Sequence, residues 1–467
     1  MPHQHTHLAD VEFDPELIAR HNGSGPRYTS YPTADRFTES PIAAQYVTAL
    51  HHRQQARPGA ALSLYVHLPF CDTVCYYCAC NKIATKDRRR ADVYLDYLEL
   101  EITLVRAEFS VAPAVTQLHL GGGTPTFLTN AQLSRLMQML KQAFDFTLDA
   151  ECSIEVDPRR LNDGTLELLA AHGFNRMSIG VQDLDPAVQQ AVNRLQPAAL
   201  TQAVLEKGRA LGYRSINLDL IYGLPKQSVR TMQATLSTVL TWRPERIALY
   251  SYAHLPERFI PQRRIESADM PNATEKLAML KLAVTTLLEA GYVYIGMDHF
   301  ALPEDDLALA LEQGTLQRNF QGYSTQADCD LIALGVSAIS RIGDTYAQNY
   351  RDLPAYYNAL DQQQLPLAKG LVMTRDDELR RAAIHDLLCQ STLDIPSFEQ
   401  AWGIEFANYF SLELAQLQPL ERDGLVELTD DSIDITPRGR FLARVVAMGF
   451  DRHLREATSS AKFSRVI

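Results

Sequence analysis

The chain has 467 residues, of which 46% are hydrophobic and 21% charged, and its formal net charge is -12 at pH 7. This composition is typical of a globular protein, and the length predicts more than one domain. The negative charge argues against a nucleic-acid partner, which would require a basic face.

No apolar run approaches the roughly 20 residues that span a bilayer, so we expect no membrane segment. The N-terminus lacks the apolar core of a secretory signal. We therefore expect a cytoplasmic protein, and a monomer because no exposed amphipathic repeat suggests assembly.

Residues 1–50 predict an N-terminal arm. They lack sustained periodicity before a helical stretch at residues 42–52, and they contain the turn-rich sequence GSGPRYTSYPTADRF. The arm precedes a regular pattern of strands and helices, and we expect it to have a conformation of its own.

Residues 51–372 predict a large α/β domain. Short apolar or β-branched runs alternate with amphipathic helices, which is typical of repeated βα units and a parallel sheet. Thr129 and Gln132 predict a capping box at a helix start, and Gly173 and Gly212 stand where helices should end. About six or seven units predict a partial or complete barrel whose strands open at one common mouth. The strand candidates are residues 63–68, 117–120, 153–156, 176–181, 216–220, 247–252 and 293–297.

Residues 373–467 predict a small, mostly helical C-terminal domain. Helices are followed by the hairpin-like stretch GLVELTDDSIDIT and by a last helix from Pro437, as in a winged-helix module. Such modules bind DNA or only pack against a neighbouring domain. With this net charge we expect packing.

Four cysteines lie in one loop, directly after the first predicted strand. The segment YVHLPFCDTVCYYCACNK places Cys71, Cys75, Cys78 and Cys80 within ten residues, whereas the other three cysteines stand alone. Soft thiolates at such spacings select zinc or an iron-sulfur cluster. A closed zinc site would draw ligands from two separate knuckles, and no second C-x2-C exists here. Buried structural cysteines would be scattered rather than grouped. The loop therefore favours an iron-sulfur cluster.

The motif C-x3-C-x2-C, with an aromatic residue before the third cysteine, resembles the radical S-adenosylmethionine (SAM) superfamily. The extension to Cys80 is similar to the family of oxygen-independent coproporphyrinogen III oxidases. That resemblance covers nearly the entire chain through PRYTSYPTA, LGGGTPT, SIEVDP, SIGVQD, NLDLIYGLPKQ, YAHLP, GMDHFA, RNFQGYSTQ and FSRVI. It implies a partial (β/α)6-type barrel with extra βα elements.

The resemblance implies a [4Fe-4S] cluster on Cys71, Cys75 and Cys78, with S-adenosylmethionine on the fourth iron. Glycines after the second strand would let the backbone approach the cofactor, although by themselves they indicate only a tight turn. Each polar residue at a strand end could, taken alone, be a core or surface residue. The implied cofactor contacts are Tyr65, the backbone of Tyr77, Gly122, Gly123, Thr124, Glu155, Gln182, Arg194, Asp219, Ala253 and Ile339.

The resemblance also implies groups near the substrate, coproporphyrinogen III. By itself Cys80 could be a fourth cluster ligand, a spare thiol or a group that acts on substrate, and the resemblance favours a functional role outside the cluster. Glu155, Phe320 and Gln321 are the further catalytic candidates. The four propionates of the substrate require cations, and Arg27 and Arg318 are the first candidates because arginine pairs well with carboxylates. The run of arginines at 88–90 is a weaker candidate, since a charge run is usually solvated. His254, Asp298 and His299 stand at strand ends, where a lone histidine is more often structural.

The implied reaction is an oxidative decarboxylation in oxygen-independent haem biosynthesis. A 5'-deoxyadenosyl radical would remove a hydrogen from a propionate, and loss of CO2 would leave a vinyl group. Two such events convert coproporphyrinogen III to protoporphyrinogen IX, with an unidentified electron donor. A haem-carrying paralogue, a radical SAM enzyme on another tetrapyrrole and a zinc-stabilised interaction module are the alternatives.

Overall fold

The computed structural model describes residues 11–39, 42–320, 322–325, 329–456, 463 and 465–466, and these form two units. The first unit is Met1–Asp35, Ala273–Ala327 and Met373–Ile467; the second is Arg36–Asn272 and Asp328–Val372. Both are discontinuous in sequence. The predicted domain boundaries after residues 50 and 372 stay predictions.

Six neighbouring parallel strands form the centre of the second unit, as the sequence predicted. Each pairs with the next in chain order, which is the arrangement that right-handed βα crossovers produce. β1 is buried along almost its whole length, as expected for a strand covered on both faces. The six are β1 (Leu62–Leu68), β4 (Ala114–Gly122), β5 (Asp145–Val156), β6 (Arg176–Gln182), β7 (Ser215–Tyr222) and β8 (Arg246–Ser251).

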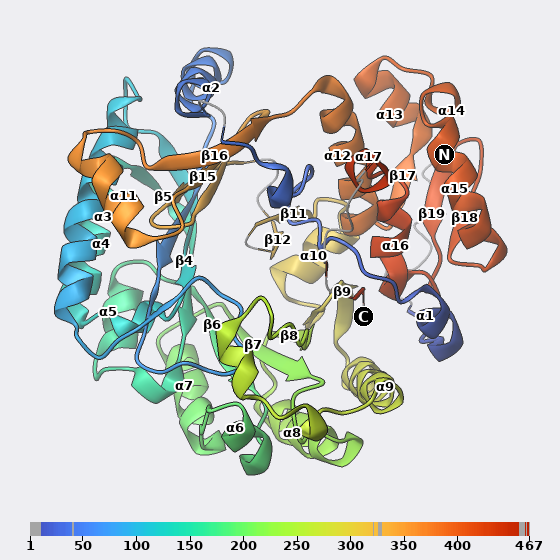
Figure 1. The fold of residues 1–467 in the computed structure, drawn as a ribbon, viewed down its shortest axis with the longest axis horizontal. Coiled ribbons are helices and arrows are strands. Elements are labelled where there is room, and N and C mark those ends of the chain that lie inside the picture. The colour runs from blue at the N-terminus through green and yellow to red at the C-terminus, as the bar shows by residue number, and fades with distance from the viewer. Residues whose placement is uncertain are drawn as a thin grey trace. The chain divides into compact units, whose positions relative to one another are not determined.

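Helices follow these strands and lie around their outer side (Figure 1). The predicted capping box is present, since Thr129 and Gln132 each bond the backbone of the other. Gly173 and Gly212 have φ of 99° and 84°, the left-handed conformation expected where a helix ends. The helices are α3 (Arg89–Ala107), α4 (Asn130–Ala143), α5 (Thr165–Ala171), α6 (Pro186–Ala191), α7 (Ala198–Ala210) and α8 (Val229–Trp242).

The sheet of the second unit continues beyond β1 through four strands. β13 (Asp330–Leu334) is parallel to β1, whereas β14 (Ile339–Ile342), β15 (Thr345–Asn349) and β16 (Leu367–Val372) are antiparallel neighbours. α2 (Ile42–Ala56) packs on this extension, and α11 (Leu353–Asp361) connects β15 to β16. The expected extra elements are thus mainly an antiparallel ribbon.

The first unit begins with α1 (Pro15–His21), which the sequence analysis missed. Asp14 caps it and Pro15 occupies its first position, a local signal too short to show periodicity. The seventh predicted strand is β9 (Val293–Gly296), which pairs antiparallel with β10 (His299–Ala301), so this hairpin is not a seventh βα unit. Around it are α9 (Ala273–Glu289), α10 (Asp306–Glu312), β11 (Gln317–Asn319) and β12 (Gly322–Ser324).

The C-terminal part of the first unit is mostly helical, as predicted. It contains α12 (Arg375–Cys389), α13 (Ile395–Trp402), α14 (Phe406–Tyr409), α15 (Ser411–Arg422), α16 (Ala443–Met448) and α17 (Arg452–Arg455). The predicted hairpin is β18 (Val426–Leu428) and β19 (Ser432–Ile435), and β17 (Thr392–Asp394) pairs with β19 on its other side. These helices and the three-stranded sheet give the winged-helix-like arrangement.

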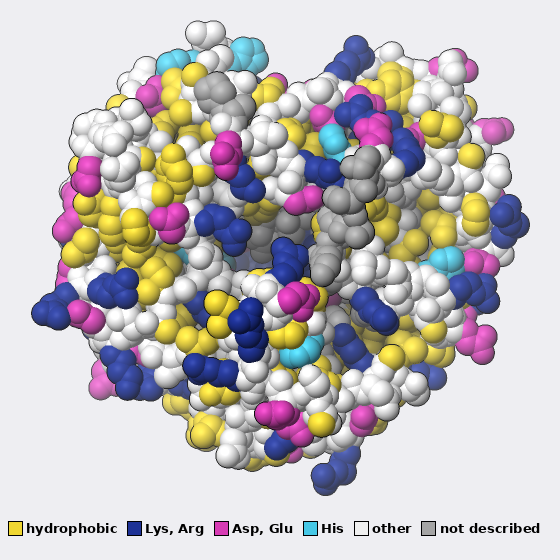
Figure 2. Space-filling view, in the orientation of Figure 1, with side chains coloured by type: hydrophobic (Ala, Val, Ile, Leu, Met, Phe, Trp, Pro, Cys, Tyr) yellow, Lys and Arg dark blue, Asp and Glu magenta, His cyan; other side chains and the backbone are white. Residues whose placement is uncertain are grey.

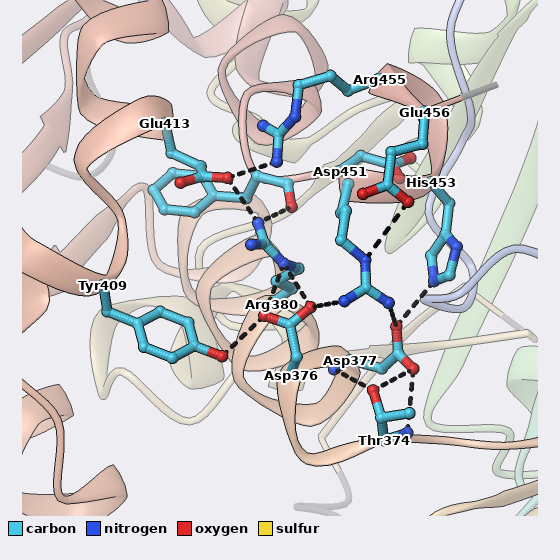
Figure 3. Close-up of polar contacts among 12 residues, drawn as sticks. Thr374, Asp376, Asp377, Arg380, Tyr409, Glu413, Asp451, His453, Arg455 and Glu456 are labelled. Atoms are coloured by element: carbon cyan, nitrogen blue, oxygen red, sulfur yellow. Dashed lines mark hydrogen bonds and ion pairs between the residues drawn. The ribbon is translucent and has the colours of Figure 1, made fainter. Parts of the chain in front are cut away.

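Charged side chains tie the helices of this part together (Figure 3). Buried Arg380 on α12 reaches Asp376 at 2.9 Å and Glu413 at 2.8 Å. Arg452 and His453 bind Asp376 and Asp377 at 2.5 and 2.7 Å. The network fixes α17 to the start of α12.

Acidic and basic side chains are interspersed on the face that Figure 2 shows. Across the described parts of the chain, no helix combines the length and apolarity that a bilayer crossing would need.

Candidate active site

The cysteine loop leaves the sheet at the carboxyl end of β1. Short strands β2 (Phe70–Cys71) and β3 (Ile83–Ala84) pair in parallel and close the loop, so residues 72–82 project from a fixed base. Cys71 and Cys75 are buried, Cys78 is half-buried and Cys80 is exposed. All four thiols therefore lie at the mouth of the parallel strands, where the sequence placed them.

The Cys71 and Cys78 thiols have different surroundings. Burial raises the pKa of the Cys71 thiol to about 12, although Thr124 Oγ1 donates a hydrogen bond to its sulfur at 3.4 Å. A hydrogen bond from Cys80 lowers the pKa of Cys78 to about 6, and the same bond raises the pKa of Cys80. Lys82 Nζ donates to the carbonyl oxygens of Cys78 and Cys80 at 3.0 and 3.4 Å. The hydrogen bond from Cys80 thus favours the thiolate form of Cys78.

The backbone on either side of Cys75 is held by the two residues that follow α6. Asn193 Nδ2 donates to the carbonyl oxygen of Val74 at 2.8 Å, and the amide of Tyr76 donates to the carbonyl oxygen of Val192 at 2.9 Å. The backbone is consequently held at both residues that flank Cys75.

The donor set fits an iron-sulfur cluster. No three His, Cys, Asp or Glu side chains among the described residues are placed to hold a single metal ion. A [4Fe-4S] cluster takes one thiolate per iron, so its ligands need not converge on one point. Three soft donors on one loop suit such a cluster and leave one iron open.

The glycine motif after β4 leaves no room for side chains. Gly122 has φ 115°, and a Cβ there would lie 2.7 Å from His67 Nδ1. A Cβ on Gly123 would lie 2.6 Å from the backbone carbon of Pro69. The Gly122 amide donates to Glu155 Oε2 at 3.1 Å. This turn therefore packs tightly against the end of β1 and is fixed by the next strand.

Tyr65 and Glu155 lie on opposite sides of β4. The Tyr65 ring stacks on His119 with 5.9 Å between centroids. His119 Nε2 lies 3.6 Å from Glu155 Oε1, and 44% of the Glu155 side chain remains exposed. Glu155 thus combines a backbone contact with a carboxylate open to a ligand.

Asp219 and Gln182 extend the polar lining to β6 and β7. Asp219 accepts hydrogen bonds from Ser178 at 3.0 Å and from Asn217 at 2.8 Å, and burial raises its pKa to about 6. Gln182 ends β6 with φ 70° at a register shift that follows Gly180. The regular pairing of β6 with β7 is therefore interrupted near the carboxyl end of β6.

Gln262 links two predicted cofactor contacts, and the sequence analysis missed it. Its Nε2 donates to the carbonyl oxygens of Tyr77 and Ala253 at 3.0 and 3.2 Å, and its Oε1 accepts from the Leu255 amide. The side chain is 1% exposed. Only the fold brings this glutamine to the cysteine loop.

Ile339, another predicted cofactor contact, is the first residue of β14 and is half-buried.

The predicted substrate residues lie in the first unit. Arg27 Nη1 is 2.5 Å from Asp298 Oδ2, and Arg318 Nη2 donates to the carbonyl oxygen of Arg27 at 3.4 Å. Arg318 also covers the Tyr323 ring at 4.8 Å. Phe320 is half-buried, whereas Gln321 lies outside the described residues.

Two further cations surround Arg27 that were not predicted from the sequence. Arg444 is buried, and its pKa is lowered to about 10 by burial and by Arg27. The pKa of Lys276 is lowered to about 8 by burial, Arg465 and Arg27. Because these cations are buried and repel one another, a bound anion would stabilise their charged forms.

The remaining candidates have structural partners. Arg88 pairs with Asp72 at 3.0 Å, and exposed Arg89 pairs with Asp87 at 2.8 Å. These two arginines of the run therefore already have acidic partners. His254 Nδ1 lies 2.9 Å from the Tyr252 hydroxyl. None of these contacts identifies a ligand.

Six parallel βα units and the cysteine loop at their mouth define a radical SAM protein. Residues 65–239 match the family model of the Radical SAM superfamily, and residues 373–442 match that of the HemN C-terminal domain. The protein accordingly uses a [4Fe-4S] cluster and S-adenosylmethionine.

Full-length relatives identify the family. The oxygen-independent coproporphyrinogen III oxidase of Salmonella typhimurium is 49% identical, covering 98% of this chain and 99% of the relative. That of Escherichia coli is 48% identical, covering 98% of this chain and 100% of the relative. A solved structure of coproporphyrinogen III oxidase from Escherichia coli, described as a radical SAM enzyme, has a TM-score of 0.91 and 47% identity over 95% of this chain and 100% of its own. The chain belongs to the family of oxygen-independent coproporphyrinogen III oxidases, which confirms the predicted family and fold.

Proposed function

We propose that the protein decarboxylates two propionates of coproporphyrinogen III to vinyl groups, giving protoporphyrinogen IX in anaerobic haem biosynthesis. One observation carries this proposal: Cys71, Cys75 and Cys78 stand together at the strand mouth of a chain nearly half identical, end to end, to enzymes of that name. When bound, the cluster supplies one electron to S-adenosylmethionine, which in turn supplies the radical that removes a propionate hydrogen.

The second unit binds and orients the cofactor in this proposal. The Gly122–Gly123 turn presents backbone to the amino group, while the half-exposed Glu155 carboxylate accepts from it. Asp219 is already oriented by Ser178 and Asn217, so its carboxylate is fixed before a ribose hydroxyl donates to it. A prearranged acceptor loses little side-chain entropy on binding.

The remaining predicted contacts complete this arrangement. Thr124 follows the glycine turn, Arg194 and Gln182 come from the β6 region, and Tyr65 and Ile339 belong to strands on the other side of β4. We infer that Tyr77 and Ala253 hold the adenine through backbone groups spaced by Gln262.

The first unit supplies the propionate contacts in this proposal. Arg27 has Asp298 as a counter-ion, whereas the Nε and Nη1 atoms of Arg318 are buried and have no hydrogen-bond partner among the described residues. Buried donors without partners are costly, and a carboxylate would satisfy both. We infer that Arg318 takes a propionate with Arg27, while Lys276 adds positive charge. Phe320 and Gln321 stay proposals on the resemblance alone.

Cys80 acts on substrate rather than on the cluster in this proposal. Cys80 is exposed on the loop, and its thiol donates a hydrogen bond to Cys78. Its chemistry is not assigned. A cytoplasmic location, a monomeric state, an unidentified electron donor and the lack of nucleic-acid or membrane partners stay predictions.

Anaerobic reconstitution tests the proposal. The cluster-loaded protein with dithionite, S-adenosylmethionine and coproporphyrinogen III should yield 5'-deoxyadenosine and vinyl products by mass spectrometry. Deoxyadenosine without vinyl products would retain the radical chemistry and refute the substrate. Tight haem binding with neither product would favour the haem-carrying alternative.

A further inference from the structure

Two guanidinium groups approach the sulfur of Cys75. Arg159 Nη2 and Arg194 Nη1 each lie 3.6 Å from Cys75 Sγ, within hydrogen-bonding distance of sulfur. Arg159 is the middle residue of the 3-10 turn Pro158–Arg160 after β5, and Arg194 follows α6. Their side chains are 14% and 7% exposed, so both contacts are shielded from bulk water.

Asp157 orients both arginines. Its Oδ1 accepts from Arg159 Nε at 2.9 Å, and its Oδ2 accepts from Arg159 Nη2 at 2.6 Å and from Arg194 Nη1 at 3.3 Å. Oδ1 also accepts from the Arg159 amide at 3.1 Å, which caps the turn. Two cations share one carboxylate, so a net positive charge faces the Cys75 sulfur.

The contacts described for the other two ligands are of a different kind. The Cys71 sulfur accepts a hydrogen bond from the neutral hydroxyl of Thr124, and the Cys78 sulfur accepts one from Cys80, with the Lys82 ammonium nearby. The environment of the three proposed ligands is therefore asymmetric. Cys75 is the one among them whose sulfur two guanidinium groups are described to contact.

Hydrogen bonds to the sulfurs and nearby charge set the reduction potential of an iron-sulfur cluster. Reduction adds one negative charge to the cluster. An N–H donor and a positive charge beside a ligand sulfur stabilise that added charge more than the oxidised state, so they raise the potential.

We propose that Arg159, held by Asp157, is a positioning residue that raises the reduction potential of the cluster through Cys75. The inference rests on the proposed assignment of Cys75 as a cluster ligand. It concerns the ease of the first electron transfer and is independent of the tetrapyrrole substrate. Neither motif spacing nor charge pattern identified Arg159, because an arginine after SIEVDP is usually solvated.

Arg159→Gln and its neighbour Arg160→Gln form a matched pair. Both remove one positive charge, but Arg160 is exposed, and its one hydrogen bond within the described parts of the chain runs from its amide to the Asp157 carbonyl. The midpoint potential of the cluster is measured by EPR-monitored redox titration without S-adenosylmethionine or substrate, alongside iron and sulfide content. Arg159→Gln should shift the reduction equilibrium about tenfold toward the oxidised cluster, which is about 59 mV for one electron. Arg160→Gln should not shift it.

A potential for Arg159→Gln equal to that of Arg160→Gln, at full iron content, overturns the proposal. If the glutamine variant does not fold by circular dichroism, Arg159→Met replaces it. Methionine keeps most of the side-chain length but has neither the charge nor an N–H donor, so the same shift toward the oxidised cluster supports the proposal and no shift refutes it. Cys75→Ser tests the ligand assignment separately, because a wild-type cluster in that variant would refute Cys75 as a ligand.

Discussion

The Tyr28 hydroxyl fixes the N-terminal arm beside Arg27, and its removal should weaken substrate binding. It donates to Asp451 Oδ2 at 2.9 Å, and Tyr28 and Asp451 are 5% and 3% exposed. A hydrogen bond to a charged group contributes about 1.5–3 kcal/mol, which corresponds to roughly 10- to 150-fold in an equilibrium. Asp451 keeps the Leu454 amide as a donor at 2.9 Å, so the lower figure applies. Tyr28→Phe should raise the KM for coproporphyrinogen III about tenfold.

The assay separates substrate binding from cofactor chemistry. KM and kcat for decarboxylation are measured beside 5'-deoxyadenosine formation without substrate and iron content. Tyr409→Phe is the control, because its hydroxyl donates to Asp376 at 2.7 Å within the same unit (Figure 3). None of the hydrogen bonds described for the Tyr409 hydroxyl goes to residues 11–35 of the arm. Equal KM values for the two variants would refute the role of the arm in placing Arg27. A loss of deoxyadenosine formation in Tyr28→Phe would place its effect on the cofactor instead.

Two further predictions concern carboxylates of the second unit whose pKa burial raises. Asp219→Asn should weaken S-adenosylmethionine binding roughly 10- to 100-fold by calorimetry, since it removes a charged acceptor, whereas exposed Asp149→Asn should not. An unchanged affinity would remove Asp219 from the cofactor site. Burial raises the pKa of Glu101 from 4.5 to about 7, so its share of stability is present below pH 4.5 and is lost as the pH rises through 7. At 1.36 kcal/mol per pKa unit the loss is about 3 kcal/mol. Urea unfolding of Glu101→Gln should lack that dependence, and parallel pH profiles for both proteins would contradict it.

The cofactor half of the site could be predicted because its determinants are local in sequence. A run of thiols after a strand and polar residues at successive strand ends meet at one mouth in a parallel sheet, whatever the details of packing. Six strands and the position of Cys71 follow from this rule, and the capping box at Thr129 follows from an equally local pairing of Thr129 with Gln132. Gln262 and Arg159 could not be found this way, because their partners are a backbone carbonyl and a sulfur far along the chain.

The same reasoning explains the errors of the fold prediction. Val293–Gly296 has the composition of a buried strand, but composition does not encode whether the next segment returns as a helix or as β10. α1 is seven residues long, and such a helix shows less than two turns of periodicity. Only its cap, Asp14 followed by Pro15, was available as a signal.

The arm shows most clearly what a single sequence does not contain. Tyr28 and Asp451 are 423 residues apart, and Arg444 binds the carbonyl oxygen of Pro26 across 418 residues. Polar contacts of this range have no period and no spacing rule, so PRYTSYPTA could be interpreted only as irregular or by resemblance. Two neighbouring residues of this motif have different surroundings: Tyr28 is fixed by the buried carboxylate of Asp451, whereas Arg27 has other cations near it besides its counter-ion Asp298. Because Tyr28 holds the backbone of the arm and Arg27 is repelled by neighbouring cations, the arm is suited to bind an anion without rearranging. The Tyr28 variant should therefore change the KM for substrate rather than the rate of the chemical step.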